Sequence, residues 1–232
     1  MNITIQKIRD ELRSESDPAK SAFLPGFFKL EPGDHDTFLG VIVPKQRAIA
    51  KRNYLELAPK EVLELLHSIV HEERLTALFI WVLQYKKGNQ AQKKEIYTLY
   101  LLNTKWVNNW DLVDSSASYI VGDYIYDKDR TILESLSISK NVWERRIAML
   151  ASGEFIRHGE YDWTLKLAER YMHDTHHYIH KATGWMLREV GKRDEAVLRD
   201  FLDNFAPRMP RTALRYAIER LDEVSRKKYL TL

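Results

Sequence analysis

The sequence contains no cysteine among its 232 residues. Disulfide bonds and thiolate metal sites are therefore excluded, and a reducing, intracellular compartment fits the chain. Long apolar runs are also missing: the longest, 77–83, has seven residues, whereas a membrane-spanning helix needs roughly 20. Segment 1–18 is charged and amphipathic and lacks the apolar stretch of a secretion signal. We therefore expect a cytoplasmic protein with no membrane association.

Glycine and proline are scarce, at 9 and 7 residues, and they fall at breaks in the pattern. Between the breaks, apolar residues recur at the i, i+3, i+4, i+7 spacing that is typical of amphipathic helices. No long period-two alternation and no Asn-Gly or Asp-Gly hairpin signal is present. The one extended-looking segment, 38–43, is bounded by Gly40 and Pro44, and we interpret it as a connector. The pattern predicts an all-α protein.

The charge balance is mildly basic, with a net charge of +3 and a pI of about 8.9. Hydrophobic residues make up 44% and charged residues 30% of the chain, an ordinary composition for a globular protein. Such a charge permits nucleic-acid binding only where the cations collect on one face. Net charge alone therefore does not decide the function.

Similar helical segments return along the chain at a period of about 36 residues. The four segments are 73–88, 109–125, 144–160 and 180–194, and shorter helices are expected before them at 59–70, 92–103, 129–139 and 161–172. In this register Arg74, Trp110, Arg146 and Ala182 coincide. One helix pair cannot bury its own apolar face, so such pairs stack on one another. We expect an α-solenoid of stacked antiparallel helix pairs with a concave groove, and the alternative is a non-repetitive helical bundle.

This register predicts a single domain over 1–232. Segment 1–52 would form an N-terminal helical layer, and 53–232 would form the helix-pair repeats. The polar segment 31–36 would separate the two.

Two tryptophans, an aspartate and an arginine fall where the second helices of successive repeats would line a common surface. Trp110 and Asp114 are spaced i, i+4, and therefore lie on one helix face. Arg146 takes the position equivalent to Trp110 one repeat later, and Trp185 lies one turn along the repeat after that. Each also has a structural interpretation, because tryptophan at helical spacing is often core, an early aspartate favours the helix dipole, and Arg146 beside Arg145 could be solvated.

Four strings carry a resemblance that covers about residues 20–220. In chain order they are FFK…DTFLGVIVPKQRAIAK, NNWDLVDSS, VWERRIAML and KATGWMLREV. Their order and spacing resemble the bacterial DNA alkylation repair enzymes of the AlkD type, which are glycosylases built from HEAT-like repeats. The resemblance implies excision of cationic N-alkylated purines, such as 3-methyladenine and 7-methylguanine, from duplex DNA without enclosing the base.

The resemblance also implies roles for individual residues. Asp114 matches the family's catalytic aspartate, and Trp110 and Trp185 match the two tryptophans that hold the DNA backbone around the lesion. Arg146 and Arg188 match arginines that contact the backbone.

Phe27 stands where the family often has tyrosine, so the ring is kept and the hydroxyl is lost. The other cations that could contact phosphate in such a protein are Lys29, Arg47, Lys51, Arg52, Lys86, Lys87, Arg157, Lys192 and Arg193. Each of them taken singly fits a solvated surface charge better than a phosphate contact.

The chemistry that the resemblance implies requires few functional groups of the protein. A purine alkylated at N3 or N7 already carries positive charge and leaves without a general acid, so one carboxylate suffices to stabilise the cationic sugar. We expect no metal and no cofactor. The histidine cluster 173–180 lacks the glutamate of an H-E-x-x-H motif and a third ligand, so we interpret it as a helix start.

The expected partner is double-stranded DNA that carries alkylated purines, bound by a monomer with no obligate protein partner. Two other functions stay open on the sequence. One is a non-catalytic helical-repeat protein that binds unusual DNA structures, and the other is a solenoid that binds a peptide in its groove.

Overall fold

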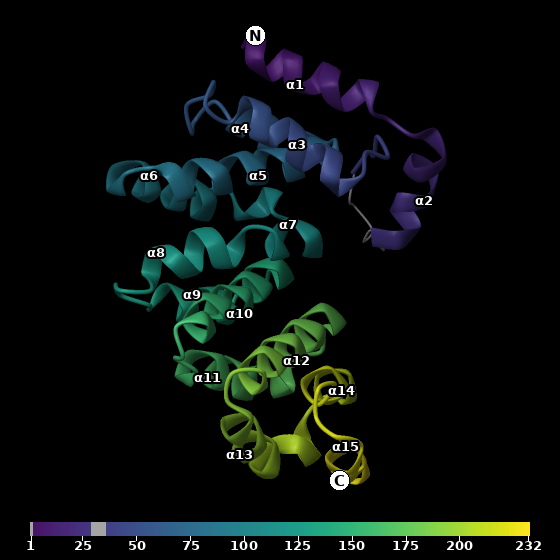
Figure 1. Cartoon of the computed structure of the whole chain (residues 1–232), viewed down its shortest axis with the longest axis vertical. Coiled ribbons are helices and arrows are strands. Elements are labelled where there is room, and N and C mark those ends of the chain that lie inside the picture. The colour runs from purple at the N-terminus through teal and green to yellow at the C-terminus, as the bar shows by residue number, and fades with distance from the viewer. Residues whose placement is uncertain (1, 29–35) are drawn as a thin grey trace. The chain divides into compact units, whose positions relative to one another are not determined.

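The computed structural model describes residues 2–28 and 36–232, and over these residues it is built from helices (Figure 1). Within this part of the chain the only β-pairing is an isolated bridge between Thr37 and Val70. Residues 38–42 are irregular and α3 begins at Val43, which confirms the predicted connector. The prediction of an all-α fold is also confirmed.

The chain divides into two compact units, Met1–Ser116 and Ala117–Leu232, called unit 1 and unit 2 below. Each unit is described by itself. The expectations of a single domain and of a concave groove along the chain concern how the two units join, and they stay predictions.

Unit 1 is organised around the long helix α5. Its elements are α1 (Ile3–Ser14), α2 (Pro18–Phe28), α3 (Val43–Asn53), α4 (Leu63–Leu66), α5 (His71–Lys87), α6 (Gln90–Leu102), a 3-10 turn (Thr104–Trp106) and α7 (Trp110–Asp114). Helix α5 contacts α1, α3, α4, α6 and α7. Its middle residues, among them Leu78, Ile80 and Trp81, are fully buried. A helix that is buried on all sides forms a core rather than a surface layer.

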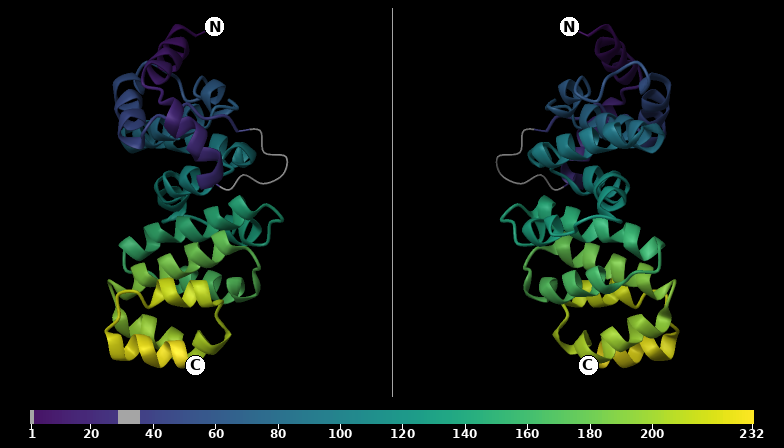
Figure 2. Two further views of the ribbon diagram at one scale, coloured as in Figure 1. Left: turned by 90° about the vertical axis from the view of Figure 1, so that its right-hand side faces the viewer. Right: turned by 90° about the vertical axis from the view of Figure 1, so that its left-hand side faces the viewer.

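Unit 2 is a row of packed helix pairs (Figure 2). Its elements are a π-helical turn (Ser118–Gly122), α8 (Asp123–Ile125), α9 (Ile132–Ser137), α10 (Val142–Arg157), α11 (Asp162–Arg170), a 3-10 turn (Tyr171–His173), α12 (His177–Gly191), α13 (Glu195–Phe205), a 3-10 turn (Ala206–Arg208), α14 (Arg211–Ala217) and α15 (Glu223–Thr231). Helix α10 packs between the π-helical turn and α12, and α12 packs between α10 and α14. Helices α9, α11 and α13 lie against them as the first members of the pairs. The predicted helix-pair repeat is confirmed.

Two glycines allow neighbouring second helices of unit 2 to touch. A Cβ atom added at Gly122 would lie 2.3 Å from the carbonyl oxygen of Ala151, and one added at Gly184 would lie 2.3 Å from that of Ala213. Real Cβ atoms do not approach backbone this closely, so only glycine fits at these contacts.

The helix starts do not follow a constant 36-residue spacing, and at α10 the superposition is off by one residue. Arg74 donates from Nη1 to the carbonyl of Ser68 at 2.9 Å, and Arg145 makes the same bond to Ser139 at 2.9 Å. Each arginine lies four residues after the N-cap of its helix. Arg145, rather than Arg146, is therefore the equivalent of Arg74, and the constant period was wrong because the loops between repeats vary in length.

Two predicted helices are shorter than expected. Segment 59–70 contains only α4 as regular helix. The Pro59 carbonyl accepts a hydrogen bond from Trp81 Nε1 at 3.0 Å, in place of a backbone amide of a helix. Segment 109–125 is interrupted after Asp114. There Ser116 Oγ lies 2.6 Å from the Leu112 carbonyl and 3.0 Å from the Tyr100 hydroxyl. A serine that bonds back to the preceding turn bends a helix, and π-helical turns often mark functional segments.

Candidate functional site

Trp110 and Asp114 form the first and last residues of the one-turn helix α7. The side chain of Asn109 starts this helix, because its oxygen accepts the Trp110 amide at 2.8 Å. Both Trp110 and Asp114 are half-buried, whereas Leu112 and Val113 between them are fully buried. The apolar side therefore anchors the turn, while Trp110 and Asp114 remain partly exposed one turn apart.

An aromatic wall, made of Phe23, Phe27, Phe28 and Trp110, adjoins this turn. The Phe27 ring lies 5.9 Å from the Trp110 ring at an interplanar angle of 68°, and the Phe28 ring lies 5.6 Å from Trp110. Phe23 continues the wall at 5.9 Å from Phe27. Phe23 and Phe27 are 65% and 50% exposed, whereas Phe28 is buried. Phe27, which was singled out from the sequence, is thus brought against Trp110.

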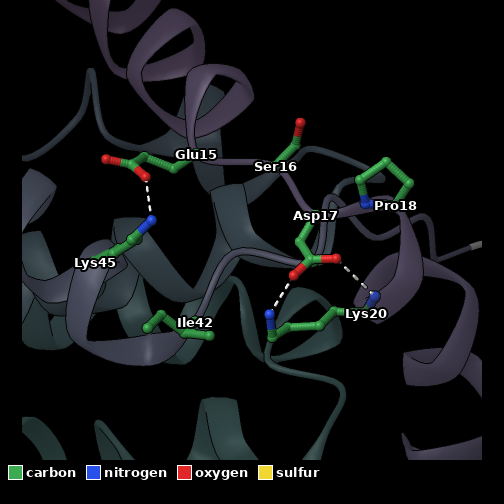
Figure 3. Close-up of a pocket in the computed structure, with 8 residues that line it drawn as sticks. Glu15, Ser16, Asp17, Pro18, Lys20, Ile42 and Lys45 are labelled. Atoms are coloured by element: carbon green, nitrogen blue, oxygen red, sulfur yellow. Dashed lines mark hydrogen bonds and ion pairs between the residues drawn. The ribbon is translucent and has the colours of Figure 1, made fainter.

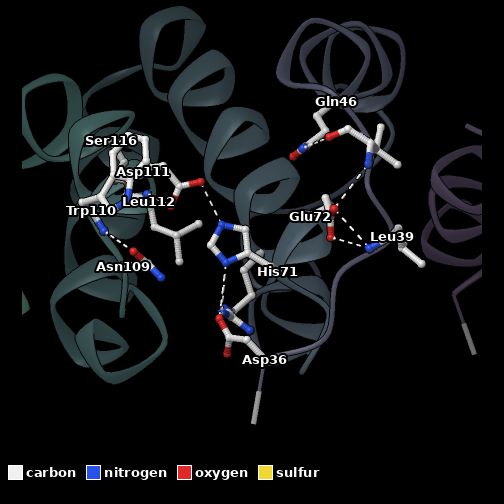
Figure 4. A network of polar contacts seen from close by, with 12 residues as sticks. Asp36, Leu39, Gln46, His71, Glu72, Asn109, Trp110, Asp111, Leu112 and Ser116 are labelled. Carbon is white, nitrogen blue, oxygen red and sulfur yellow. Dashed lines mark hydrogen bonds and ion pairs between the residues drawn. The ribbon is translucent and has the colours of Figure 1, made fainter. Parts of the chain in front are cut away.

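Behind α7 lies a buried ionic network centred on His71 (Figure 4). His71 Nε2 lies 2.8 Å from Asp111 Oδ2, and His71 Nδ1 lies 3.3 Å from Asp36 Oδ2. The Arg74 guanidinium also pairs with Asp36. Burial by itself would lower the pKa of His71, but the charges and hydrogen bonds of Asp111 and Asp36 outweigh it and raise that pKa to about 9. His71 is therefore protonated at neutral pH.

Sequence reasoning did not find His71, Asp111 or Asp36 as parts of the site. Asp111 lies directly after Trp110, but an aspartate in a first helical turn is common and signals only a favourable dipole. Its pairing with His71 joins residues 40 positions apart, which no periodicity reveals.

The negative charge of the Asp114 carboxylate helps to raise the pKa of Tyr100 within unit 1. Burial raises the pKa of the Tyr100 phenol far above its usual value; the hydrogen bond with Ser116 opposes this, and the charge of Asp114 adds to it. Asp114 thus lies close enough to a fully buried phenol to act on it electrostatically.

In unit 2, Trp185 lies on α12 beside a group of cations. Its Nε1 donates to Glu189 Oε1 at 3.2 Å, and the same carboxylate pairs with Lys192 and Arg193. Arg157 pairs with Glu154 and donates to Ser118 Oγ at 2.9 Å; burial lowers the pKa of Arg157, and the charge of Arg193 adds to this effect. We call Arg157, Lys192 and Arg193 the basic cluster. Two of the predicted phosphate contacts, Lys192 and Arg193, thus share a carboxylate with the second tryptophan.

The remaining predicted contacts have different surroundings. Arg146 is 4% exposed, and its Nη1 donates to the Tyr178 carbonyl at 2.5 Å, so it ties α10 to the start of α12. Arg188 pairs with Glu219. Arg47 is exposed on α3 with its guanidinium 4.0 Å from the centre of the Phe79 ring. Lys29 lies outside the described residues, and phosphate contacts by all four stay predictions.

The histidine cluster forms the start of α12, as predicted. His176 is the N-cap, with its Nδ1 accepting the Tyr178 amide at 3.3 Å, and His180 bonds to the Asp174 carbonyl at 2.5 Å. Within residues 2–28 and 36–232, no three His, Asp or Glu side chains are arranged to hold a metal ion. Over the same residues, no helix is long and apolar enough to cross a bilayer.

One pocket of about 260 Å³ lies away from these side chains, in unit 1 (Figure 3). Glu15, Asp17, Lys20 and Lys45 line it, and they are already joined in the ion pairs Glu15–Lys45 and Asp17–Lys20. It contains none of the predicted site residues.

Comparison with solved structures identifies the class of fold. A protein from Enterococcus faecalis, described as a predicted DNA alkylation repair enzyme, superimposes with a TM-score of 0.71 at 16% identity, covering 90% of this chain and 98% of that one. AlkD2 from Streptococcus mutans superimposes with a TM-score of 0.57 at 19% identity, covering 87% and 97%. At these identities the likeness shows the fold alone, which is that of the AlkD-like helical-repeat proteins.

The family follows from the sequence. The model of the DNA alkylation repair enzyme family matches residues 8–221, and the chain therefore belongs to this family. A comparison with curated protein sequences gives no significant match. Membership supports a role in the repair of alkylated DNA and agrees with the resemblance derived from the four sequence strings.

Proposed function

We propose that the protein is a monofunctional DNA glycosylase that removes cationic N3- and N7-alkylated purines from duplex DNA, with Asp114 as the catalytic residue. The observation that carries the proposal is the geometry of α7. Asp114 and Trp110, both partly exposed, lie one turn apart on α7 in a chain that belongs to the alkylation repair family.

The reaction breaks the bond between C1′ and the purine nitrogen. Both electrons of the bond go to the base, which cancels the positive charge that alkylation created, so the base leaves without protonation. The sugar is left as an oxocarbenium-like cation, and the Asp114 carboxylate stabilises it electrostatically. Water then adds to C1′ and gives its proton to Asp114 or to solvent.

The indoles bind rather than react. Trp110 offers a π face to the deoxyribose and its developing charge, a contact worth about 0.5–2 kcal/mol. Trp185 and the basic cluster bind the phosphate backbone, which supplies affinity without sequence information. Because the damaged base itself carries the positive charge, selection does not require a deep base pocket.

The decisive experiment incubates the protein with methylated duplex DNA and quantifies released 7-methylguanine and 3-methyladenine. The Asp114→Asn variant should lose excision by at least about 100-fold, as when a preorganised charge is removed from a reaction centre, and should keep its DNA affinity. Asp10→Asn, an exposed aspartate on α1, is the matched control and should excise normally.

Unchanged excision by Asp114→Asn would contradict the proposal. Binding of methylated DNA with no base release by the wild type would favour the non-catalytic DNA-binding alternative instead.

A further inference from the structure

His71 is the first residue of α5, and its imidazole is 2% exposed. Both ring nitrogens have acidic partners that come from other parts of unit 1. Nε2 faces Asp111 of α7 at 2.8 Å, and Nδ1 faces Asp36 of the segment before α3 at 3.3 Å. The imidazole thus joins the central helix to α7 and to Asp36 of the segment before α3 (Figure 4).

The His71 imidazole also connects to α7 through apolar aromatic rings. The Phe28 ring lies 4.5 Å from the His71 ring and 5.6 Å from the Trp110 ring, tilted against both. Phe38 lies 5.1 Å from the imidazole and 5.3 Å from Phe28, nearly parallel to it. His71 therefore reaches α7 through the carboxylate of Asp111 and through the Phe28 ring, which lies tilted against Trp110 at 30°.

A five-residue helix has little stability of its own, because nucleating a helix costs more than one turn returns. The orientation of α7 therefore depends on what holds it. Its polar anchors are the Asn109 cap and the Asp111–His71 pair. Asp111 lies between Trp110 and Asp114, so a shift at Asp111 moves both.

We propose that His71 is a positioning residue that fixes α7 through Asp111 and so sets Trp110 and Asp114 in their working geometry. The proposal rests on the proposed glycosylase function for its catalytic consequence. Its structural part, the control of Trp110 by His71, is independent of that function.

The charges around the imidazole favour its protonated form. Asp111 faces it from α7 and Asp36 from the segment before α3, while Arg74, on α5 itself, opposes them. Glu72 is directed elsewhere, since its carboxylate accepts the backbone amides of Leu39, Gly40 and Val41. The rings that touch His71 carry no charge. Deprotonation would remove the positive charge that faces the Asp111 carboxylate and the donor to one of the two acidic partners, and α7 should then loosen.

The test follows Trp110 directly, with 5-fluorotryptophan incorporated and the Trp110 resonance assigned by Trp110→Phe. In the wild type this resonance should titrate with a midpoint near pH 9. The titration should disappear in His71→Gln and His71→Asn. His67→Gln is the matched control, because His67 stacks on Trp106 at 5.1 Å; it should move the Trp106 signal and leave that of Trp110 in place.

The two His71 variants separate positioning from simple filling of space. A glutamine amide reaches the place of Nε2 and can still donate to Asp111, whereas an asparagine amide reaches only the place of Nδ1. At neutral pH, His71→Asn should lower kcat for base release about 10- to 100-fold with KM changed less than about twofold, as for a small displacement of catalytic groups. His71→Gln should recover most of that loss.

The proposal would be overturned if the position of the Trp110 resonance changed neither with pH nor in the His71 variants. If the variants do not fold, the wild-type titration and Asp111→Asn decide the same question. Absence of base release by the wild type would instead refute the glycosylase function, and the fluorine titration would still report on positioning.

Discussion

The Phe27 ring meets the Trp110 indole nearly edge-on, with 5.9 Å between their centres, while half of Phe27 remains exposed. An aromatic pair in this geometry is worth about 0.5–1.5 kcal/mol beyond its burial. Phe27 therefore supports the indole from one side and offers its own ring to whatever lies against Trp110.

Phe27→Ala should weaken both DNA binding and excision, because Trp110 loses that support and the DNA loses an apolar contact. The energy of one aromatic pair corresponds to roughly a 2- to 10-fold loss. Fluorescence anisotropy with methylated duplex DNA measures the affinity. Phe27→Tyr keeps the ring and should stay within about twofold of the wild type, so an equal loss in both variants would contradict this account.

The basic cluster should determine part of the salt dependence of DNA binding. Each phosphate contact contributes about 0.9 to the slope of log K against log salt concentration. The double variant Lys192→Gln/Arg193→Gln should therefore reduce the slope by up to about 1.8. Lys227→Gln, an exposed lysine on α15 that pairs with Glu223, is the control and should leave the slope unchanged. An unchanged slope in the double variant would remove the cluster from the interface.

Stability should decrease on the alkaline side because of His71. Its folded-state pKa of about 9 exceeds the unfolded value of 6.5, so the folded protein binds the proton more tightly. This contribution is fully present below about pH 6.5 and is lost as pH rises through about 9, with a maximum slope near ~1.4 kcal/mol per pH unit. Urea unfolding between pH 6 and 10 measures it. In His71→Asn the slope over this range should be markedly smaller, and an identical pH profile would argue against the charged pair.

Gly184→Ala should destabilise the protein, since the new methyl group would lie 2.3 Å from the Ala213 carbonyl and 2.5 Å from Tyr216 Cβ. Overpacking of this kind costs about 1–3 kcal/mol or more. Gly153→Ala on α10 is the matched control, because its nearest neighbour is the flexible sulfur of Met186 at 3.3 Å. Thermal unfolding should show a clear fall in Tm for Gly184→Ala and little change for Gly153→Ala.

The sequence predicted most of the fold because helical periodicity is local. It identified the helix pairs and the connector at 38–43, and it placed Trp110 and Asp114 one turn apart. It did not predict where the helix after Asp114 breaks, because that depends on Ser116 bonding to both Leu112 and Tyr100. The register was wrong by one residue at Arg146, since loops of unequal length separate the repeats.

The support behind the site could not be predicted for a different reason. His71, Asp111 and Asp36 are ordinary residues in their local contexts, and only folding brings them together. Burial then changes what they do, because a histidine near the surface would be mostly neutral at pH 8, whereas this one keeps its proton.

The aromatic wall carries no ionisable group. Tyrosine at position 27 would add a phenol to it, whereas phenylalanine leaves four side chains whose chemistry is the same in weak acid and in weak alkali. The wall itself therefore adds no inflection to a pH–rate profile, and the Phe27→Tyr variant would introduce a titrating phenol beside Trp110.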